Sequence, residues 1–208
     1  MQIILYTAPV DIENEIEIIQ NALDAGVDYL YIRKPELDDF SLVDFVEKIP
    51  EKYWNKCISS SLIITKEFNL GGYHFTRDII EKNEKYNDKV LEWLHTNNKI
   101  CSVSAHNENE ILTYSNKSNH VIVSPIFKSI SKQNYSYEWN FDELKQNIAT
   151  IKIRKNNIQL FAVGGIDINN ITLVKQLGFN GVGLLGAIWN ASFKAQNELI
   201  SIIETIKK

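Results

Sequence analysis

The sequence has few of the features that mark membrane, nucleic-acid-binding or disulfide-rich proteins. Its 208 residues include two cysteines, four prolines and one methionine, and the net charge is only −4. No apolar run approaches the roughly 20 residues that span a bilayer, and the lysines and arginines form no basic face for nucleic acid or lipid. The first ten residues, MQIILYTAPV, lack the positively charged start of a signal peptide. We therefore expect a cytoplasmic protein that binds neither nucleic acid nor membranes.

The two cysteines, Cys57 and Cys101, lie far apart and match no metal-ligand spacing. We predict that they are reduced thiols packed in the core. A hydrophobic content of 44% and a charged content of 23% are typical of a globular protein. Since single α/β barrels commonly have roughly 200 to 250 residues, one domain over residues 1–208 is predicted.

Short apolar runs rich in β-branched residues alternate along the chain with segments of helical periodicity. There are eight such runs: IILY (3–6), YLYI (29–32), CIS (57–59), GYHF (72–75), ICSV (100–103), VIV (121–123), QLFAV (159–163) and GVGLL (181–185). Helices are predicted at 11–25, from 38 or 39 to 46, and at 61–69, 78–94, 107–115, 140–149, 167–177 and 192–206. This alternation indicates an α/β fold with a parallel sheet, for which we favour a (β/α)8 TIM barrel over an open doubly wound sheet.

Two adjacent glycines, Gly164 and Gly165, directly follow the seventh run, and Gly186 follows the eighth. Barrels of this kind often hold a phosphate group after strands seven and eight. Because glycine has no Cβ, backbone amides there can approach an anion closely, and a helix that begins next adds partial positive charge. We therefore predict a phosphate site at these glycines, with a tight turn that binds nothing as the alternative.

Six segments in a specific order resemble the thiamine phosphate synthase family, including its thiazole tautomerase branch. They are GVDYLYIRKP, GYHF, SVSAH, VSPIFKSISK, AVGGI and GVGLLGAI. The resemblance covers nearly the whole chain. The resemblance implies a transferase of thiamine biosynthesis. Family enzymes join hydroxymethylpyrimidine diphosphate to a thiazole phosphate with Mg²⁺ and release pyrophosphate.

The resemblance also assigns site residues. A thiazole phosphate would be bound by the backbone at Gly164, Gly165, Leu185 and Gly186 and by the hydroxyls of Ser129 and Ser131. The residues assigned to the reaction itself are Arg33, Lys132 and Ser104. Arg33 offers a planar fork for a phosphate group, Lys132 matches a lysine that reaches the pyrophosphate, and Ser104 matches a serine near the pyrimidine.

The sequence departs from the family pattern in the half of the site that would hold the pyrimidine diphosphate. Tyr31 and Pro35 replace a glutamine and a lysine, and Ser59 and Ser60 replace an Asn-Asp pair whose aspartate binds Mg²⁺. The position of a second metal-binding aspartate falls on Ile79, one residue after Asp78. A serine hydroxyl cannot replace a carboxylate in holding Mg²⁺, so Asp78 is the remaining candidate ligand.

These departures leave two alternatives to a synthase. One is a binding or regulatory protein that keeps the phosphate site without the metal chemistry. The other is a different phosphate-dependent isomerase that uses His106 or Lys132, because Pro125 occupies the place of the tautomerase branch's histidine. Lys34, next to Arg33, should point to the opposite face of its strand. Both a monomer and a homodimer fit the sequence.

Overall fold

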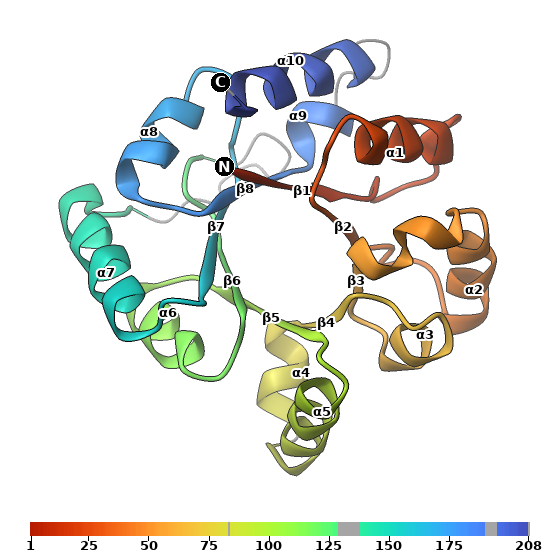
Figure 1. Cartoon of the computed structure of the whole chain (residues 1–208), viewed down its shortest axis with the longest axis horizontal. Helices are drawn as coiled ribbons and strands as arrows, with labels where there is room; N and C mark the ends of the chain where they lie inside the picture. The colour runs from red at the N-terminus through yellow and green to blue at the C-terminus, as the bar shows by residue number, and fades with distance from the viewer. Residues whose placement is uncertain (83, 129–137, 190–194, 208) are drawn as a thin grey trace.

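The computed structural model describes residues 1–82, 84–128, 138–189 and 195–207. Eight parallel strands form a closed barrel in sequence order. They are β1 (Gln2–Tyr6), β2 (Tyr29–Ile32), β3 (Cys57–Ser59), β4 (Gly72–Phe75), β5 (Ile100–Ala105), β6 (His120–Val123), β7 (Gln159–Val163) and β8 (Gly181–Leu184). Figure 1 shows the strands as an inner ring with the helices outside it.

The pairing of the first and last strands decides between the two predicted folds. Ile3 of β1 pairs with Val182 of β8, which closes the sheet. The predicted TIM barrel is therefore confirmed, and the open doubly wound sheet is wrong. Each strand lies within two residues of its predicted range, because a short run of apolar residues between turn signals marks a buried parallel strand clearly.

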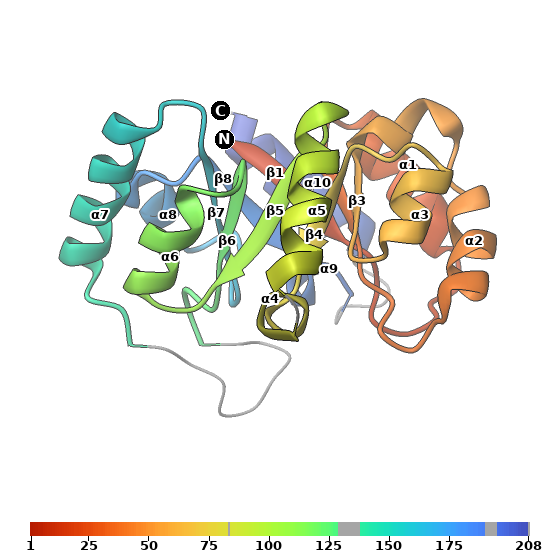
Figure 2. The same cartoon turned by 90° about the horizontal axis from the view of Figure 1, so that it is seen from below.

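Helices follow the strands around the outside of the barrel. They are α1 (Glu15–Asp24), α2 (Asp39–Glu47), α3 (Leu62–Glu67), α4 (Arg77–Lys82), α5 (Glu84–Thr96), α6 (Glu108–Ser115), α7 (Phe141–Arg154), α8 (Ile171–Leu177), α9 (Gly186–Trp189) and α10 (Ala195–Lys207), with a 3-10 helix η1 (Glu51–Lys56). None of them, within the described ranges, is long and apolar enough to cross a bilayer. Figure 2 shows α4 and α9, which follow β4 and β8, at the same end of the barrel.

Several helix boundaries differ from the prediction. The predicted helix at 11–25 begins only at Glu15, because Asn14 has a left-handed backbone with φ of 62° that cannot continue a helix. The predicted helix at 78–94 is two helices, α4 and α5. The sequence did not predict η1, whose Tyr53 amide donates to the carbonyl of Pro50. The short α9 agrees with the helix expected to begin at Gly186.

The alternation of side chains along each strand separates two cores. The larger core lies between the strands and the helices and includes Ile3, Leu5 and Leu30. The smaller core fills the barrel and includes Tyr6 and Tyr31. The interior of the barrel therefore carries the polar groups that reach its open end.

Both cysteines are buried, unbridged thiols, as predicted. Burial raises the pKa of each thiol to about 12. Neither cysteine is therefore suited to act as a nucleophile at neutral pH.

Candidate functional site

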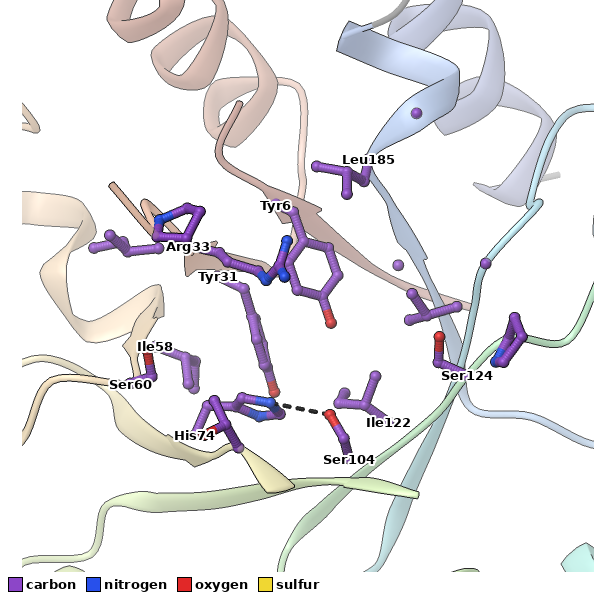
Figure 3. Close-up of a pocket in the computed structure, with 18 of the residues that line it drawn as sticks. Tyr6, Tyr31, Arg33, Ile58, Ser60, His74, Ser104, Ile122, Ser124 and Leu185 are labelled. Atoms are coloured by element: carbon purple, nitrogen blue, oxygen red, sulfur yellow. Dashed lines mark hydrogen bonds between the residues drawn. The ribbon is translucent and has the colours of Figure 1, made fainter. Parts of the chain in front are cut away.

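A cavity of about 630 Å³ opens at the carboxyl ends of the strands, and every strand or its following loop contributes to its lining. The lining includes seven of the residues predicted from the sequence: Arg33, Asp78, Ser104, Gly164, Gly165, Leu185 and Gly186. Figure 3 shows Tyr6, Arg33, His74 and Ser104 directed toward this cavity. Ser129, Ser131 and Lys132, which were predicted to bind phosphate groups, lie outside the described residues.

The two adjacent glycines shape the wall of the cavity after β7. Gly164 and Gly165 have φ values of 93° and 67°, which strongly favour glycine. A Cβ on Gly165 would lie 2.5 Å from the carbonyl oxygen of Lys128, and one on Gly164 would lie 2.8 Å from the Cα of Pro125. The loops after β6 and β7 thus pack against each other where the two Cβ atoms would be. The glycines are required by this packing and by the backbone conformation, whereas the sequence had suggested the approach of a phosphate.

Backbone amides are nevertheless available on the cavity side. The pairing of Val163 with Gly183 brings the loops after β7 and β8 next to each other. Within the described part of the chain, the amides of Gly165, Ile166, Gly186 and Ala187 donate no hydrogen bond to another protein group, and all four residues line the cavity. An anion between the two loops would satisfy these donors. We call this arrangement the amide cradle.

Arg33 and Lys34, the two basic residues that directly follow β2, point in opposite directions. Arg33 is exposed and lines the cavity, and its backbone amide donates to the hydroxyl of Thr7 over 2.8 Å. Lys34 is buried and forms an ion pair of 2.5 Å with Glu15, with its Nζ 4.9 Å from the ring centre of Phe45. Burial raises the pKa of Glu15 although Lys34 opposes the shift. The ammonium group of Lys34 thus lies on the helix side of the barrel wall, between Glu15 of α1 and Phe45 of α2, as predicted.

Two histidines line the cavity. The Nδ1 and Nε2 atoms of His74 lie 2.9 Å from Ser102 Oγ and 3.1 Å from Ser104 Oγ, and burial lowers the pKa of His74 to about 4. His106 Nδ1 lies 2.6 Å from the carbonyl oxygen of Ser124. Because a carbonyl only accepts, this nitrogen must carry the hydrogen, and Nε2 of a neutral His106 is then an acceptor.

Sequence reasoning missed Tyr6. Tyr6 is the last residue of β1 and shares its inward face with Ile4. The alternation along this strand could have identified it, since the last inward residue of a barrel strand reaches the mouth. The ring centres of Tyr6 and Tyr31 lie 5.3 Å apart. The two rings form an aromatic floor of the cavity.

Comparison of the sequence with models of protein families matches residues 3–188 to the family described as thiamine monophosphate synthase. This chain belongs to that family. The family and the biosynthetic class predicted from the sequence motifs are therefore confirmed.

Individual relatives of this family agree. The thiamine-phosphate synthase of Flavobacterium johnsoniae is 23% identical over 188 residues, which cover 88% of this chain and 86% of that protein. The thiamine-phosphate synthase of Prochlorococcus marinus is 27% identical over 205 residues, and this chain spans only 55% of its length.

Solved structures show the same architecture. The thiamine phosphate pyrophosphorylase of Bacteroides thetaiotaomicron has 26% identity and a TM-score of 0.73, with 100% of this chain and 96% of that chain covered. The enzyme of the same name from Pyrococcus furiosus has a TM-score of 0.74 at 16% identity, with coverage of 100% and 97%, and shows the shared fold alone.

The carboxylates of the cavity bear on the expected Mg²⁺ site. Asp78 is the single carboxylate among the cavity-lining residues that the structure describes. Ser59 is buried and its Oγ accepts from the amide of Ser61 over 3.1 Å. In the same described ranges, no group of three histidine, cysteine, aspartate or glutamate side chains could hold a metal ion. The donor set therefore fits only a Mg²⁺ ion that arrives with phosphate groups of a substrate.

The positive charge near Asp78 is largely engaged with acids. Arg77 lies 2.6 Å from Glu110 and 3.7 Å from Glu81, and the hydrogen bond with Glu110 raises the pKa of Arg77. Arg33 has no such acidic partner within the described residues. The structure thus leaves Arg33 as the principal described cation available to a diphosphate.

Proposed function

We propose that this protein is a thiamine-phosphate synthase, a transferase that couples hydroxymethylpyrimidine diphosphate to thiazole phosphate and releases pyrophosphate. The observation that carries the proposal is the amide cradle, which opens into the same cavity as Arg33 and Ser104. Backbone amides without a protein partner fit a phosphate monoester, and a guanidinium fits a second, more highly charged phosphate group.

The proposal gives each half of the cavity one substrate. The thiazole phosphate would occupy the amide cradle, with the hydroxyls of Ser129 and Ser131 as further donors. The diphosphate would contact Arg33 and Lys132, and the pyrimidine ring would lie near Ser104. Holding both substrates in one cavity converts a reaction between two molecules into a reaction within one complex, which is a large part of the acceleration.

Mg²⁺ is proposed to enter with the diphosphate and to be held on the protein side by Asp78, the single carboxylate of the described lining. The ion would offset charge on the departing pyrophosphate. Asp78→Asn should then raise the Mg²⁺ concentration that the reaction needs, and the matched variant Asp88→Asn, on α5 outside the cavity lining, should not.

The decisive experiment incubates the purified protein with both substrates and Mg²⁺ and measures thiamine phosphate by chromatography. A product rate above that of the Arg33→Ala variant supports the proposal. If the product does not exceed a blank without protein, the protein is not a synthase.

A binding protein is the second candidate, favoured by Tyr31, Pro35, Ser59 and Ser60 in the diphosphate half. Calorimetry would then detect thiazole phosphate binding that does not depend on Mg²⁺, without any turnover.

An isomerase is the third candidate, favoured by the acceptor Nε2 of His106. In that case His106→Gln would abolish turnover of a thiazole phosphate presented alone.

A cytosolic location and a homodimer remain predictions. Sedimentation of the purified protein would measure its oligomeric state, and cell fractionation would test the location.

A further inference from the structure

At the floor of the cavity, five polar side chains form an unbroken line of hydrogen bonds, which we call the interior network: Ser104, His74, Ser102, Tyr31 and His120. Ser104 Oγ lies 3.1 Å from His74 Nε2, and His74 Nδ1 lies 2.9 Å from Ser102 Oγ. The Tyr31 hydroxyl lies 2.8 Å from Ser102 Oγ and 3.2 Å from His120 Nδ1. Figure 3 shows Tyr31, His74 and Ser104 converging at the floor of the cavity.

Three members of the interior network, Ser104, His74 and Tyr31, line the cavity, whereas Ser102 and His120 do not. Ser102, Tyr31 and His120 are at most 3% exposed. The ring centres of Tyr31 and His74 lie 5.6 Å apart. The ring centres of His120 and Phe161 lie 4.9 Å apart. The buried end therefore has little freedom to take other partners.

The number of hydrogens on each group restricts which atoms of the interior network donate and which accept. Each hydroxyl and each neutral imidazole has one hydrogen to donate. Burial lowers the pKa of His74 to about 4 and that of His120 to about 3, so both rings are neutral at pH 7. His74, Ser102 and Tyr31 each have one hydrogen and two partners along the line, so each donates one of its hydrogen bonds and accepts the other. The direction of one hydrogen bond therefore sets the direction of all the others.

The structure favours one direction. Tyr31 donates to Ser102 Oγ, so the Ser102 hydrogen goes to His74 Nδ1, and His74 Nε2–H donates to Ser104 Oγ. Tyr31 in turn accepts from His120 Nδ1–H. The reverse direction would place the hydrogen of His120 on Nε2, for which no acceptor is found among the described residues. His120 is only 3% exposed, so an N–H without a protein acceptor is less favourable there than an unused lone pair.

We propose that Tyr31 and Ser102 are positioning residues that act through His74 to hold the Ser104 hydroxyl as a hydrogen-bond donor toward the ligand. The site would then prefer a heteroaromatic ring that presents an acceptor, such as a ring nitrogen, beside Ser104. This preference rests on the proposed function, in which a pyrimidine supplies that acceptor. Tyr31 stands where the family pattern has glutamine, so the network gives a role to a departure from that pattern.

The interior network orients hydrogens and does not carry a net proton. A proton delivered to its buried end would have to reside on His120. With a pKa of about 3, that ring is protonated in roughly one molecule in ten thousand at pH 7.

The first test needs no substrate. Long-range ¹H–¹⁵N NMR distinguishes the two tautomers of neutral histidine, and the chain has four histidines to assign. We expect His74 in the Nε2–H form and His120 in the Nδ1–H form at pH 7. Tyr31→Phe removes one hydroxyl and keeps the ring, and should convert His74 to a mixture of tautomers. The matched control Tyr29→Phe, on the same strand outside the network, should leave His74 unchanged.

The second test uses the proposed reaction. Tyr31→Phe and Ser102→Ala should each lower kcat/KM for the diphosphate substrate about fivefold, the effect of one ordered hydrogen bond, without changing the affinity for thiazole phosphate. In a Ser104→Ala background the additional loss from Tyr31→Phe should disappear, because the two residues act through the same group.

The outcomes separate this inference from the proposed function. A wild-type His74 in the Nδ1–H form, or a tautomer unchanged by Tyr31→Phe, would overturn the inference even in an active enzyme. The expected tautomers in a protein without synthase activity would reject the synthase and keep the network as an orienting device.

Discussion

The two buried histidines of the barrel should make the fold sensitive to mild acid. His120 is 3% exposed and burial lowers its pKa to about 3, with a smaller effect from His74. In the unfolded chain a histidine has a pKa of about 6.5 and binds a proton more readily than the folded chain does. Stability is therefore fully present above about pH 6.5 and falls as the pH decreases toward 3.

The expected magnitude follows from the two pKa values of His120. Between pH 7.5 and pH 5.0 the unfolded ring becomes almost fully protonated while the folded ring stays neutral, which lowers the free energy of unfolding by about 2 kcal/mol. His74 has a pKa of about 4 and adds a smaller amount, because it lines the cavity and is partly open to solvent. For a urea dependence of about 2 kcal/mol per molar, His120 alone shifts the midpoint by roughly 1 M.

Urea unfolding measured by tryptophan fluorescence at several pH values checks this prediction, and comparison with His120→Phe isolates the contribution of His120. This variant replaces the imidazole by an apolar ring. Its free energy of unfolding should fall by about 2 kcal/mol less than that of the wild type between pH 7.5 and pH 5.0. The control His95→Gln, on the exposed side of α5, should behave as the wild type. A pH dependence that is the same in His120→Phe and in the wild type would refute the reasoning.

Three further predictions concern the cavity and its support. Gly165→Ala should abolish phosphate binding measured by calorimetry, since φ of 67° costs about 1–2 kcal/mol for alanine and its Cβ would meet Lys128. Gly178→Ala, with φ of 93° away from the cavity, should lower the unfolding midpoint but keep binding, and equal loss of binding in both variants would contradict the cradle. Lys34→Met should destabilise the fold by about 3 kcal/mol in urea unfolding by leaving Glu15 buried without its partner; an unchanged midpoint would show that the ion pair contributes nothing. Arg33→Lys should raise the KM of the diphosphate substrate about tenfold, because an ammonium lacks the planar fork, and a KM within twofold of the wild type would remove Arg33 from that role.

Local sequence patterns predicted some features of the site and not others. Alternation along β2 placed Lys34 on the face opposite to Arg33, and the ion pair with Glu15 agrees with that prediction. The position of Gly164 and Gly165 after the seventh strand was also visible in the sequence, but the reason for them was not. Their Cβ positions are occupied by the loop after β6, and contacts between loops leave no periodic signal.

The sequence by itself determined the order of strands and helices and the family, because these depend on residues close together in the chain. The tertiary structure alone decided which inward residues meet. Tyr31 bonds to Ser102 and His120, which lie 71 and 89 positions further along the chain. Such contacts depend on the closure and stagger of the whole barrel, and that geometry arises only when all eight strands pair.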